Sequence, residues 1–324
     1  MRMVLPFAAG LLSAAGAYWI MHRGDQLGLT DHPNERSSHI RPVPKGGGIG
    51  ILLAFALAAW GLCLPWGLAI PAGVVSLMSF WGDKVELPAT IRLIIQFLSA
   101  IIAFLALQPV HHHPVVVLIL ILPMAVFIVG TANVYNFMDG INGIAAITGA
   151  IAFLLLTIFG VLTGKPGAMT TFSITMIIAC LGFLPFNFPN ARVFMGDVGS
   201  ILLGFLFASM VVWFSETLTD FLCLSGFLFP FYADALTTIA IRIRDGENIT
   251  QAHRRHMYQL LANEMKIPHS FITCGYGAVQ MLIGISLIIA RHYNPMAVLG
   301  VMAFSFVIFL AASFGVRYLV ETRN

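Results

Sequence analysis

Long apolar runs constrain this chain more than any other feature of its sequence. They recur from residue 3 to residue 316, and each is about twenty residues long, enough to cross roughly 30 Å of hydrocarbon as an α-helix. A cleaved signal peptide would explain only one such run. The sequence therefore predicts an all-α fold, a polytopic transmembrane helix bundle.

The composition agrees with a membrane protein. Charged residues make up 10% of the chain and hydrophobic residues 59%, whereas soluble proteins carry about 25% charged residues. No soluble domain or repeat is evident, so residues 1–324 are predicted to form a single integral-membrane domain. We expect about eleven spans, at approximately 3–21, 47–64, 66–81, 91–107, 115–134, 141–162, 168–186, 198–214, 221–241, 269–290 and 295–316.

Basic residues gather in the loops on one side of these spans. Short cytoplasmic loops keep Lys and Arg, whereas exported loops lose them. The N-terminus is therefore predicted to lie outside and the C-terminus in the cytoplasm. The net charge of +3 is small and dispersed over these loops, so nucleic acid is not an expected partner.

Carboxylates recur at the predicted cytoplasmic face. Asp83 follows the third span, Asp139 follows the fifth, Asp197 opens the eighth, and Asp31 heads the first polar loop, while Asp234 lies inside the ninth span. An aspartate at a membrane helix end is costly unless it is paired, hydrated or bound to a cation. Mg²⁺ accepts one or two carboxylates and completes its shell with water and substrate phosphates. The pattern predicts a Mg²⁺ site for a phosphate substrate, with Mn²⁺ as an alternative, although each aspartate could instead cap the next helix.

Two polar loops offer further candidates. In the segment His253–Gln259, positions 253, 256 and 259 would share a face if the segment were helical, and that face would offer donors to phosphate and uracil. The alternative interpretation is a basic loop that only sets topology. The loop Asp31–Gly48 lacks the Lys-Ser/Thr ending of a P-loop, which excludes a nucleotide cradle of that type.

Four segments together resemble the polyprenyl-phosphate N-acetylhexosamine-1-phosphate transferase family, glycosyltransferase family 4. The similarity covers nearly the whole chain. The motif sequences resemble most the branch that initiates O-antigen, which is related to the phospho-N-acetylmuramoyl-pentapeptide transferases. The matching segments are Asp31–Gly48, Asn133–Gly143, Phe194–Ser200 and His253–Gln259.

The resemblance implies an activity and its partners. The chain would transfer an N-acetylhexosamine-1-phosphate from a UDP-sugar to undecaprenyl phosphate, release UMP, and so start a lipid-linked envelope glycan such as the O-antigen of lipopolysaccharide. It would be a multi-pass protein of the bacterial inner membrane, surrounded by membrane lipid, with its active site on the cytoplasmic face. Whether it forms a homodimer is left open.

The resemblance also implies roles for individual residues. The expected catalytic residues are Asp83, Asn136, Asp139 and Asp197. Two of these, Asn136 and Asp197, are the expected metal ligands. The expected substrate-binding residues are Lys45, Asn142, Asn187, His253, Arg254 and His256.

The sequence departs from the family pattern after the third span. The family places two adjacent aspartates there, and Gly82 stands in the first position, while Asn142 replaces a frequent aspartate. A two-step reaction through position 82 is therefore impossible. Direct attack stays open, because a phosphomonoester with a second pKa of about 6 is mostly dianionic at neutral pH. The rival interpretations are an impaired relative that binds lipid phosphate, and a secondary transporter, which would use charges near the membrane midplane.

Overall fold

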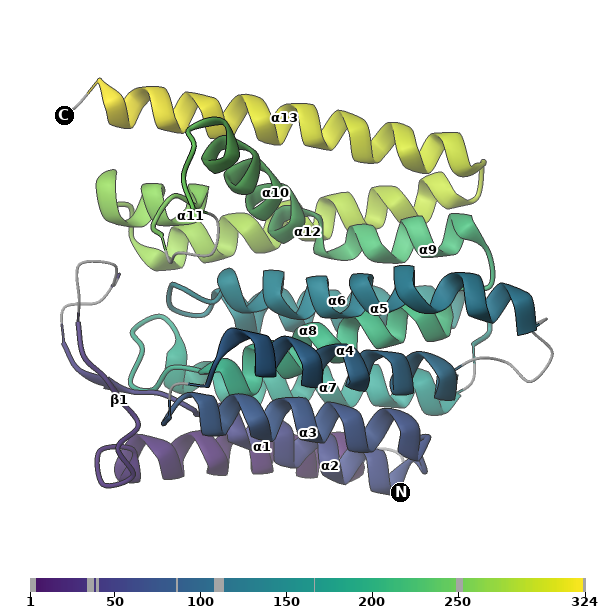
Figure 1. Cartoon of the computed structure of the whole chain (residues 1–324), viewed down its shortest axis with the longest axis horizontal. Helices are drawn as coiled ribbons and strands as arrows, with labels where there is room; N and C mark the ends of the chain where they lie inside the picture. Colours follow the sequence, from purple (N-terminus) through teal and green to yellow (C-terminus); the bar gives the residue numbers. More distant parts are fainter. Residues whose placement is uncertain are drawn as a thin grey trace.

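The chain folds into a helix bundle with one short β-ribbon (Figure 1). The computed structural model describes residues 4–33, 38, 41–85, 87–107, 114–165, 167–248 and 253–322. The long helices are α1 (Val4–Arg23), α2 (Ile49–Gly61), α3 (Trp66–Gly82), α4 (Ala89–Leu107), α5 (Pro114–Phe137), α6 (Ile144–Leu162), α7 (Gly167–Asn187), α8 (Asp197–Phe214), α10 (Phe229–Arg244), α12 (His269–Arg291) and α13 (Pro295–Glu321). The short elements are α9 (Leu218–Ser225), η1 (Gly226–Leu228), α11 (Met257–Gln259), η2 (Leu260–Glu264), and the antiparallel strands β1 (Thr30–Asp31) and β2 (Val43–Pro44).

Each predicted span coincides with a helix, which confirms an all-α, multi-pass membrane architecture. Within the described ranges, nine helical stretches are long and apolar enough to cross a membrane. The helices α2 and α3 are shorter, with 13 and 17 residues, so the number of crossings stays a prediction. The two termini lie at opposite ends of the bundle (Figure 1). An odd number of crossings requires that arrangement.

The ninth predicted span is interrupted. Helix α9 ends at Ser225, a 3₁₀ turn follows, and α10 begins at Phe229 with Pro230 in its first turn. Proline has no N–H to donate and its ring clashes with the preceding turn, so it begins a helix well but does not continue one. The apolar run is unbroken in sequence, which is why the break was not predicted. Helix α10 consequently leaves the common direction and crosses obliquely toward α13 (Figure 1).

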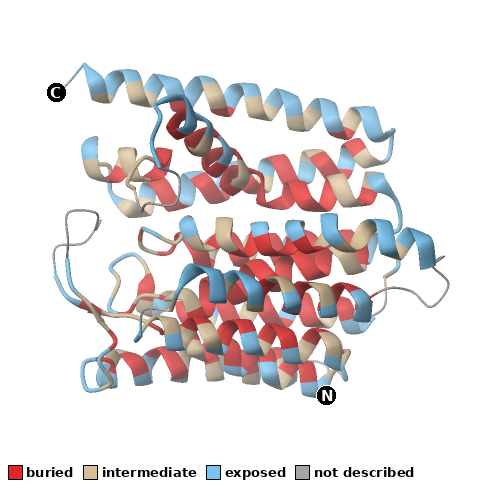
Figure 2. Ribbon diagram, in the orientation of Figure 1, coloured by how far each residue is buried: buried red, intermediate tan, exposed pale blue. Residues whose placement is uncertain are grey.

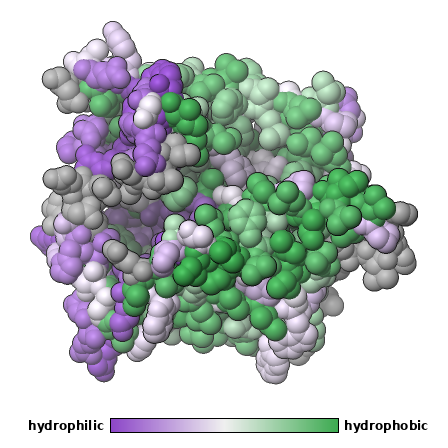
Figure 3. All heavy atoms as spheres, viewed as in Figure 1, coloured by the Kyte–Doolittle hydropathy of each residue, from purple (hydrophilic) through white to green (hydrophobic). Residues whose placement is uncertain are grey.

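Burial separates a central helix from helices that face the surroundings. Every residue of α8 from Val198 to Val211 is buried, whereas α13 exposes large apolar side chains, including Phe304 at 69%. A helix that is apolar all round and exposed suits a lipid environment. Figure 2 shows exposed residues along the outer helices, and Figure 3 shows hydrophilic residues gathered mainly at the end that holds β1 and the C-terminus.

Small residues bring the first helices into close contact. A Cβ added to Gly16 of α1 would lie 2.4 Å from the Cα of Gly50 in α2, and one added to Gly182 of α7 would lie 2.3 Å from the carbonyl oxygen of Gly10. Membrane helices associate by such close packing, because lipid tails are as apolar as leucine and give no hydrophobic drive. These contacts fix α1 against α2 and α7, next to the first polar loop.

Candidate active site

A polar cavity of about 350 Å³ opens at the hydrophilic end of the bundle. Its walls come from the loops that follow α1, α3, α5 and α7, and from α11. Six of the residues predicted as site residues line it: Lys45, Asp83, Asn136, Asp139, Asn187 and Asp197. The other lining residues are Asp31, Ser38, Gly140, Ile141, Phe194, Gly196 and Gln259.

Backbone pairing carries the first loop to the start of α8. The N–H of Phe194 donates to the carbonyl of Pro44 over 2.8 Å, and the N–H of Gly47 donates to the carbonyl of Phe194 over 2.9 Å. Lys45 forms a parallel bridge with Phe194 between these two bonds. The ribbon therefore brings Lys45 to the loop before α8, although more than a hundred residues separate them in sequence.

The loop before α8 packs directly onto Asp83. The backbone N–H of Asp197 donates to Oδ2 of Asp83 over 3.1 Å. Gly196 has φ of +72°, and a Cβ there would lie 2.7 Å from the nitrogen of Gly46 and 2.8 Å from Asp83 Oδ2. Only glycine combines that backbone conformation with so close an approach, so Gly196 allows Asp83 and Asp197 to share one wall.

Of the four carboxylates that line the cavity, Asp83 and Asp197 each have a basic partner. Lys45 Nζ lies 3.5 Å from Oδ1 of Asp83, and a guanidinium nitrogen of Arg92 lies 3.0 Å from Oδ2 of Asp197. The backbone N–H of Asp139 donates to the carbonyl of Asn136 over 3.1 Å, whereas its carboxylate has no hydrogen-bond or ion-pair partner in the part of the chain that the structure describes. Four carboxylates thus line the cavity and two basic side chains pair with them, which leaves an excess of negative charge that a bound cation would neutralise.

Burial and neighbouring negative charge shift the pKa values of two of these carboxylates. Burial, followed by the negative charge of Asp197, raises the pKa of Asp83 from 3.8 to about 7, although Lys45 acts in the opposite direction. Burial, followed by the charges of Asp197 and Asp83, raises the pKa of Asp139 to about 7. Both groups therefore titrate near neutral pH, which is typical of functional sites.

The amide side chains fix the cavity walls. The hydroxyl of Ser200 donates to Oδ1 of Asn136 over 2.7 Å. Asn187 accepts from the N–H of Gly143 over 2.7 Å and donates to the carbonyl of Val193 over 2.9 Å. Asn187 therefore joins the end of α7 to the start of α6 and to the loop before α8.

Asn142 lies outside the cavity lining. Its side-chain amide donates to the carbonyl of Pro189 over 3.0 Å, and its own carbonyl accepts from the Thr273 hydroxyl over 2.9 Å. These bonds tie the loop after α5 to the loop after α7 and to α12.

Asp234 organises the basic segment His253–Gln259. Its carboxylate is fully buried in α10 and accepts from the N–H of Met257 over 2.8 Å and from the N–H of Tyr258 over 3.3 Å. The Tyr276 hydroxyl donates to it over 2.7 Å, and His256 Nδ1 lies 3.4 Å away. Asp234, which the sequence places inside the ninth span, therefore supports this segment, and the neighbouring ring is that of His256.

Three predicted substrate-binding residues lie beside the cavity and do not line it. The segment becomes helical only at Met257, so His253 and His256 do not share a helical face, although their ring centroids are 4.9 Å apart. His256 is buried, and Arg254 pairs with Glu264 over 3.0 Å. Burial, followed by His256 and Arg242, lowers the pKa of His253 to about 4. His253 is therefore neutral at pH 7 and can donate only through a ring N–H.

Sequence reasoning missed the roles of Arg92 and Ser200. Arg92 is one of the basic residues from which the orientation of the spans was predicted. The neighbouring sequence does not indicate that Asp197 is its partner. Ser200 was part of a motif without a role of its own. Gln259 was predicted to share a donor face with His253 and His256. Of these three residues, only Gln259 lines the cavity.

The donor set suits a hard cation that shares its shell with substrate. Among the residues the structure describes, no three His, Cys, Asp or Glu side chains converge closely enough to hold a metal ion by themselves. The cavity instead offers carboxylates and the amide of Asn136. Mg²⁺ commonly takes one or two carboxylates together with phosphate oxygens and waters.

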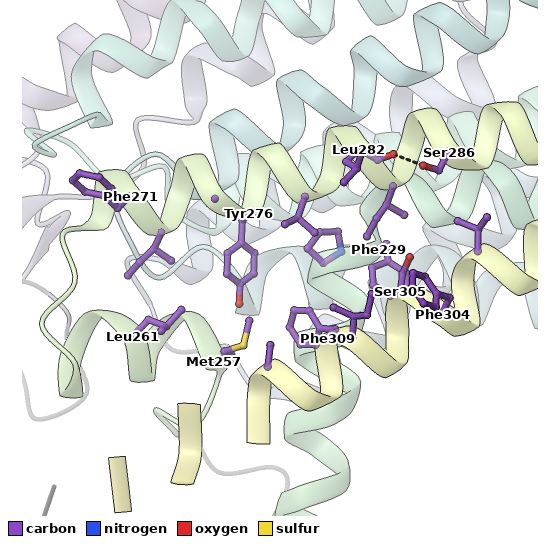
Figure 4. A pocket seen from close by; sticks show the side chains of 18 of the residues that line it. Phe229, Met257, Leu261, Phe271, Tyr276, Leu282, Ser286, Phe304, Ser305 and Phe309 are labelled. Atoms are coloured by element: carbon purple, nitrogen blue, oxygen red, sulfur yellow. Dashed lines mark hydrogen bonds between the residues drawn. The ribbon is translucent and has the colours of Figure 1, made fainter. Parts of the chain in front are cut away.

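An apolar cavity of about 660 Å³ lies between α12, α13 and the start of α10 (Figure 4). Met257 and Leu261 form its wall next to the basic segment, and Tyr276 extends toward Met257 in the view. Since Gln259 lines the polar cavity, α11 and η2 separate the two cavities.

Comparison with known proteins finds a family model and several relatives that this chain resembles. Residues 65–215 match the family model described as glycosyl transferase family 4. Over this segment the chain is similar to glycosyl transferase family 4. The matched segment runs from α3 into the turn after α8 and contains Asp83, Asp139 and Asp197. The other cavity residues Asp31 and Lys45 and the segment His253–Gln259 lie outside it.

Three curated relatives of this chain are transferases by name, and two of the names include a polyprenyl phosphate. A decaprenyl-phosphate N-acetylglucosaminephosphotransferase of Mycolicibacterium smegmatis is 27% identical over 309 residues, 81% of this chain and 75% of the relative. A probable undecaprenyl-phosphate N-acetylglucosaminyl 1-phosphate transferase of Bacillus subtilis is 28% identical over 218 residues, 63% of this chain and 61% of the relative. A phospho-N-acetylmuramoyl-pentapeptide-transferase of Staphylococcus epidermidis is 41% identical over 101 residues, 31% of this chain and 30% of the relative.

Proposed function

We propose that this chain transfers an N-acetylhexosamine-1-phosphate from a UDP-sugar to undecaprenyl phosphate and releases UMP. The observation that carries the proposal is the convergence of Asp83, Asp139, Asp197 and Lys45 on one cavity at the hydrophilic end of the bundle. The relatives' names support the acceptor and the transferred group. The product would start a lipid-linked envelope glycan in the bacterial inner membrane. The motif sequences favour O-antigen as that glycan.

Mg²⁺ is the proposed cofactor, with Mn²⁺ as an alternative. Asp197 and the amide of Asn136 would hold it, with Asp83 or Asp139 nearby. When bound, the ion would neutralise charge on the diphosphate and on the departing UMP. Arg92 and Lys45, which now pair with Asp197 and Asp83, would then be released to contact phosphate oxygens.

The proposed step is a direct displacement. A phosphate oxygen of the acceptor attacks the β-phosphorus of the UDP-sugar, the bond from that phosphorus to the bridging oxygen breaks, and the electron pair leaves with UMP. No protein nucleophile takes part, in keeping with Gly82. The protein's contribution is positioning and electrostatic stabilisation, which dominate phosphoryl transfer in general.

The two cavities match the two ends of the acceptor. Undecaprenyl phosphate joins a charged head to a long apolar chain. The polar cavity would receive the head, and the apolar cavity between α12 and α13 would receive part of the chain. Both cavities adjoin the segment of α11 and η2, so one ligand could reach from one to the other around it.

The deciding experiment measures UMP release by the purified protein in detergent. The assay contains undecaprenyl phosphate, Mg²⁺ and a panel of UDP-N-acetylhexosamines, with EDTA as the control. Gly82→Asp is assayed in parallel. A Cβ at position 82 meets only Leu87 Cδ1, at 3.8 Å, so the variant fits the helix end. Release that needs both metal and lipid supports the proposal; activity restored only by Gly82→Asp would identify an impaired relative.

Mg²⁺ is expected to stabilise the protein more at pH 8 than at pH 6. Asp83 and Asp139 have folded-state pKa values of about 7, above the ordinary 3.8, so the folded state binds these protons more tightly than the unfolded chain. Without metal, the stability that these two groups contribute is therefore fully present below about pH 4 and is lost as the pH rises through about 7. A metal must displace these protons, which weakens its binding about tenfold per proton and per pH unit below 7.

Thermal unfolding in detergent, with Mg²⁺ or EDTA between pH 5.5 and 8.5, measures this effect. The double variant Asp83→Asn/Asp139→Asn serves as the control and is expected to lose the pH dependence of the Mg²⁺ gain in Tm. An equal gain at pH 6 and pH 8 in the native chain would contradict the prediction.

Gly275→Leu is expected to raise the KM for undecaprenyl phosphate about tenfold and to leave the KM for the UDP-sugar unchanged. Gly275 lines the apolar cavity, and a Cβ there meets nothing within 4 Å. A leucine would occupy space proposed for the prenyl chain, and such changes in an apolar pocket are worth about 1–3 kcal/mol. Gly300→Leu is the matched control, because Gly300 also has free space and lies outside the cavity. The same change in KM in both variants would show that the prenyl chain binds outside this apolar cavity.

A further inference from the structure

A third cavity lies between the C-terminal parts of α10 and α13. It measures about 460 Å³, and its walls combine three arginines with apolar and aromatic side chains: Arg244, Arg255, Arg317, Leu260, Phe314 and Tyr318. The proposed transfer reaction uses none of these residues. Helix α10 reaches α13 here because it crosses the bundle obliquely (Figure 1).

Among the residues that line this cavity, three are arginines and one is a carboxylate. Asp245 pairs with Arg255 over 2.7 Å and with Arg244 over 3.1 Å, and Glu247 also pairs with Arg255. Arg317 has no carboxylate partner among the described residues. Glu321 is the one carboxylate of the lining residues.

Hydrogen bonds hold Arg317 in place but do not use all of its guanidinium donors. One guanidinium nitrogen donates to the carbonyl of Arg255 over 2.8 Å, and it lies 3.4 Å from the Thr238 hydroxyl. Its Nε is buried and has no hydrogen-bond partner among the described residues. A buried donor without a partner is costly, and an anion in the cavity would remove that cost.

An apolar track continues from Arg317 along α13. Phe314, Leu310, Val307 and Ala303 precede Arg317 at helical spacings of three and four, so they follow one face of the helix. Phe314 is 49% exposed and Val307 is 63% exposed. The track runs from the hydrophilic end toward the middle of the membrane-spanning part.

We propose that this cavity binds the headgroup phosphate of an anionic bilayer phospholipid, with one acyl chain along the track on α13. Basic pockets between membrane helices bind anionic headgroups, and each Lys or Arg near the surface contributes roughly 1 kcal/mol. A free phosphate would gain nothing from the apolar track. Because Arg255 and Leu260 flank α11, the bound lipid also restrains the segment that carries Gln259 into the polar cavity.

Native mass spectrometry of the full chain, equilibrated with phosphatidylglycerol and phosphatidylcholine in equal amounts, tests the proposal without any assay of activity. The native chain is expected to retain phosphatidylglycerol preferentially. Arg317→Gln is expected to weaken that retention about fivefold, and Arg317→Lys to preserve most of it. Phe314→Ser is expected to weaken retention of both lipids, and the Tm of each variant shows that the fold is kept.

Arg192→Gln is the matched control, since Arg192 lies at the same end of the bundle and donates to the carbonyl of Pro185, outside this cavity. If Arg192→Gln lost as much phosphatidylglycerol as Arg317→Gln, the lipid preference would be due to general surface charge. That result would overturn the proposal. Competition by sn-glycerol 3-phosphate as strong as that by the lipid would assign the site to a free phosphate. Selective displacement of phosphatidylglycerol by undecaprenyl phosphate would assign it to the acceptor. Either result would also overturn it.

Discussion

Asp197→Asn is expected to lower the rate of UMP release by about 10²–10³-fold. Asp197 opens α8 at the cavity wall, where its backbone N–H binds Asp83 and its carboxylate faces Arg92. The amide keeps the shape of the side chain but removes the negative charge proposed to hold Mg²⁺. Losing one preorganised electrostatic contact to a transition state typically has an effect of this size.

The stability of Asp197→Asn is expected to stay within about 1 kcal/mol of the native chain, because the Arg92 pair is partly exposed and such pairs contribute little. The Mg²⁺-induced rise in Tm should disappear together with the activity. Asp245→Asn is the control, since Asp245 also pairs with arginines but lies outside the polar cavity. Retention of both activity and the Mg²⁺ effect would exclude Asp197 as the metal ligand.

The sequence predicts the membrane architecture well because apolar runs of sufficient length have few alternatives to spanning helices. It fails at the interruption of the ninth span. Pro230 stands inside an apolar stretch, and hydropathy does not register a break in backbone hydrogen bonding. That break turns α10 toward α13 and thereby creates the arginine-lined cavity, which no pattern in the sequence indicates.

The candidate site is predictable in outline and not in its pairing. Carboxylates at one membrane face could be grouped from topology alone, and Asp83, Asp139 and Asp197 do share a cavity. Arg92 could not be assigned, because a basic residue at a helix start has the same appearance whether it sets topology or pairs with a carboxylate 105 residues away. Long-range pairing of this kind depends on packing angles that local sequence does not encode.

The basic segment illustrates the same limit. A donor face through positions 253, 256 and 259 assumed one continuous helix, but the backbone is extended at His256 and helical only from Met257. The Asp234 carboxylate causes this start, because it accepts the first free N–H groups of α11 in the way an N-cap does. Only Gln259 is thereby turned into the polar cavity, while His256 is buried beside the carboxylate.

Asp234→Ala is accordingly expected to lower the free energy of unfolding by about 3–5 kcal/mol, among the largest effects of a single substitution. It would leave the N–H groups of Met257 and Tyr258 and the Tyr276 hydroxyl without their acceptor in a buried site. Each such loss costs about 1–3 kcal/mol. Thermal unfolding in detergent measures the change, and hydrogen exchange of residues 253–264 locates it.

Asp220→Ala separates this local effect from general instability. Asp220 is a second buried carboxylate, at the opposite end of the bundle, where it accepts from the N–H of Thr217 and pairs with Arg291. Both variants should lower the Tm, but only Asp234→Ala should speed hydrogen exchange at Met257 and Tyr258. Since that segment carries Gln259 into the polar cavity, the folded fraction of Asp234→Ala should also bind the UDP-sugar more weakly than the folded fraction of Asp220→Ala. Unchanged exchange at those two amides would show that contacts other than Asp234 position the loop.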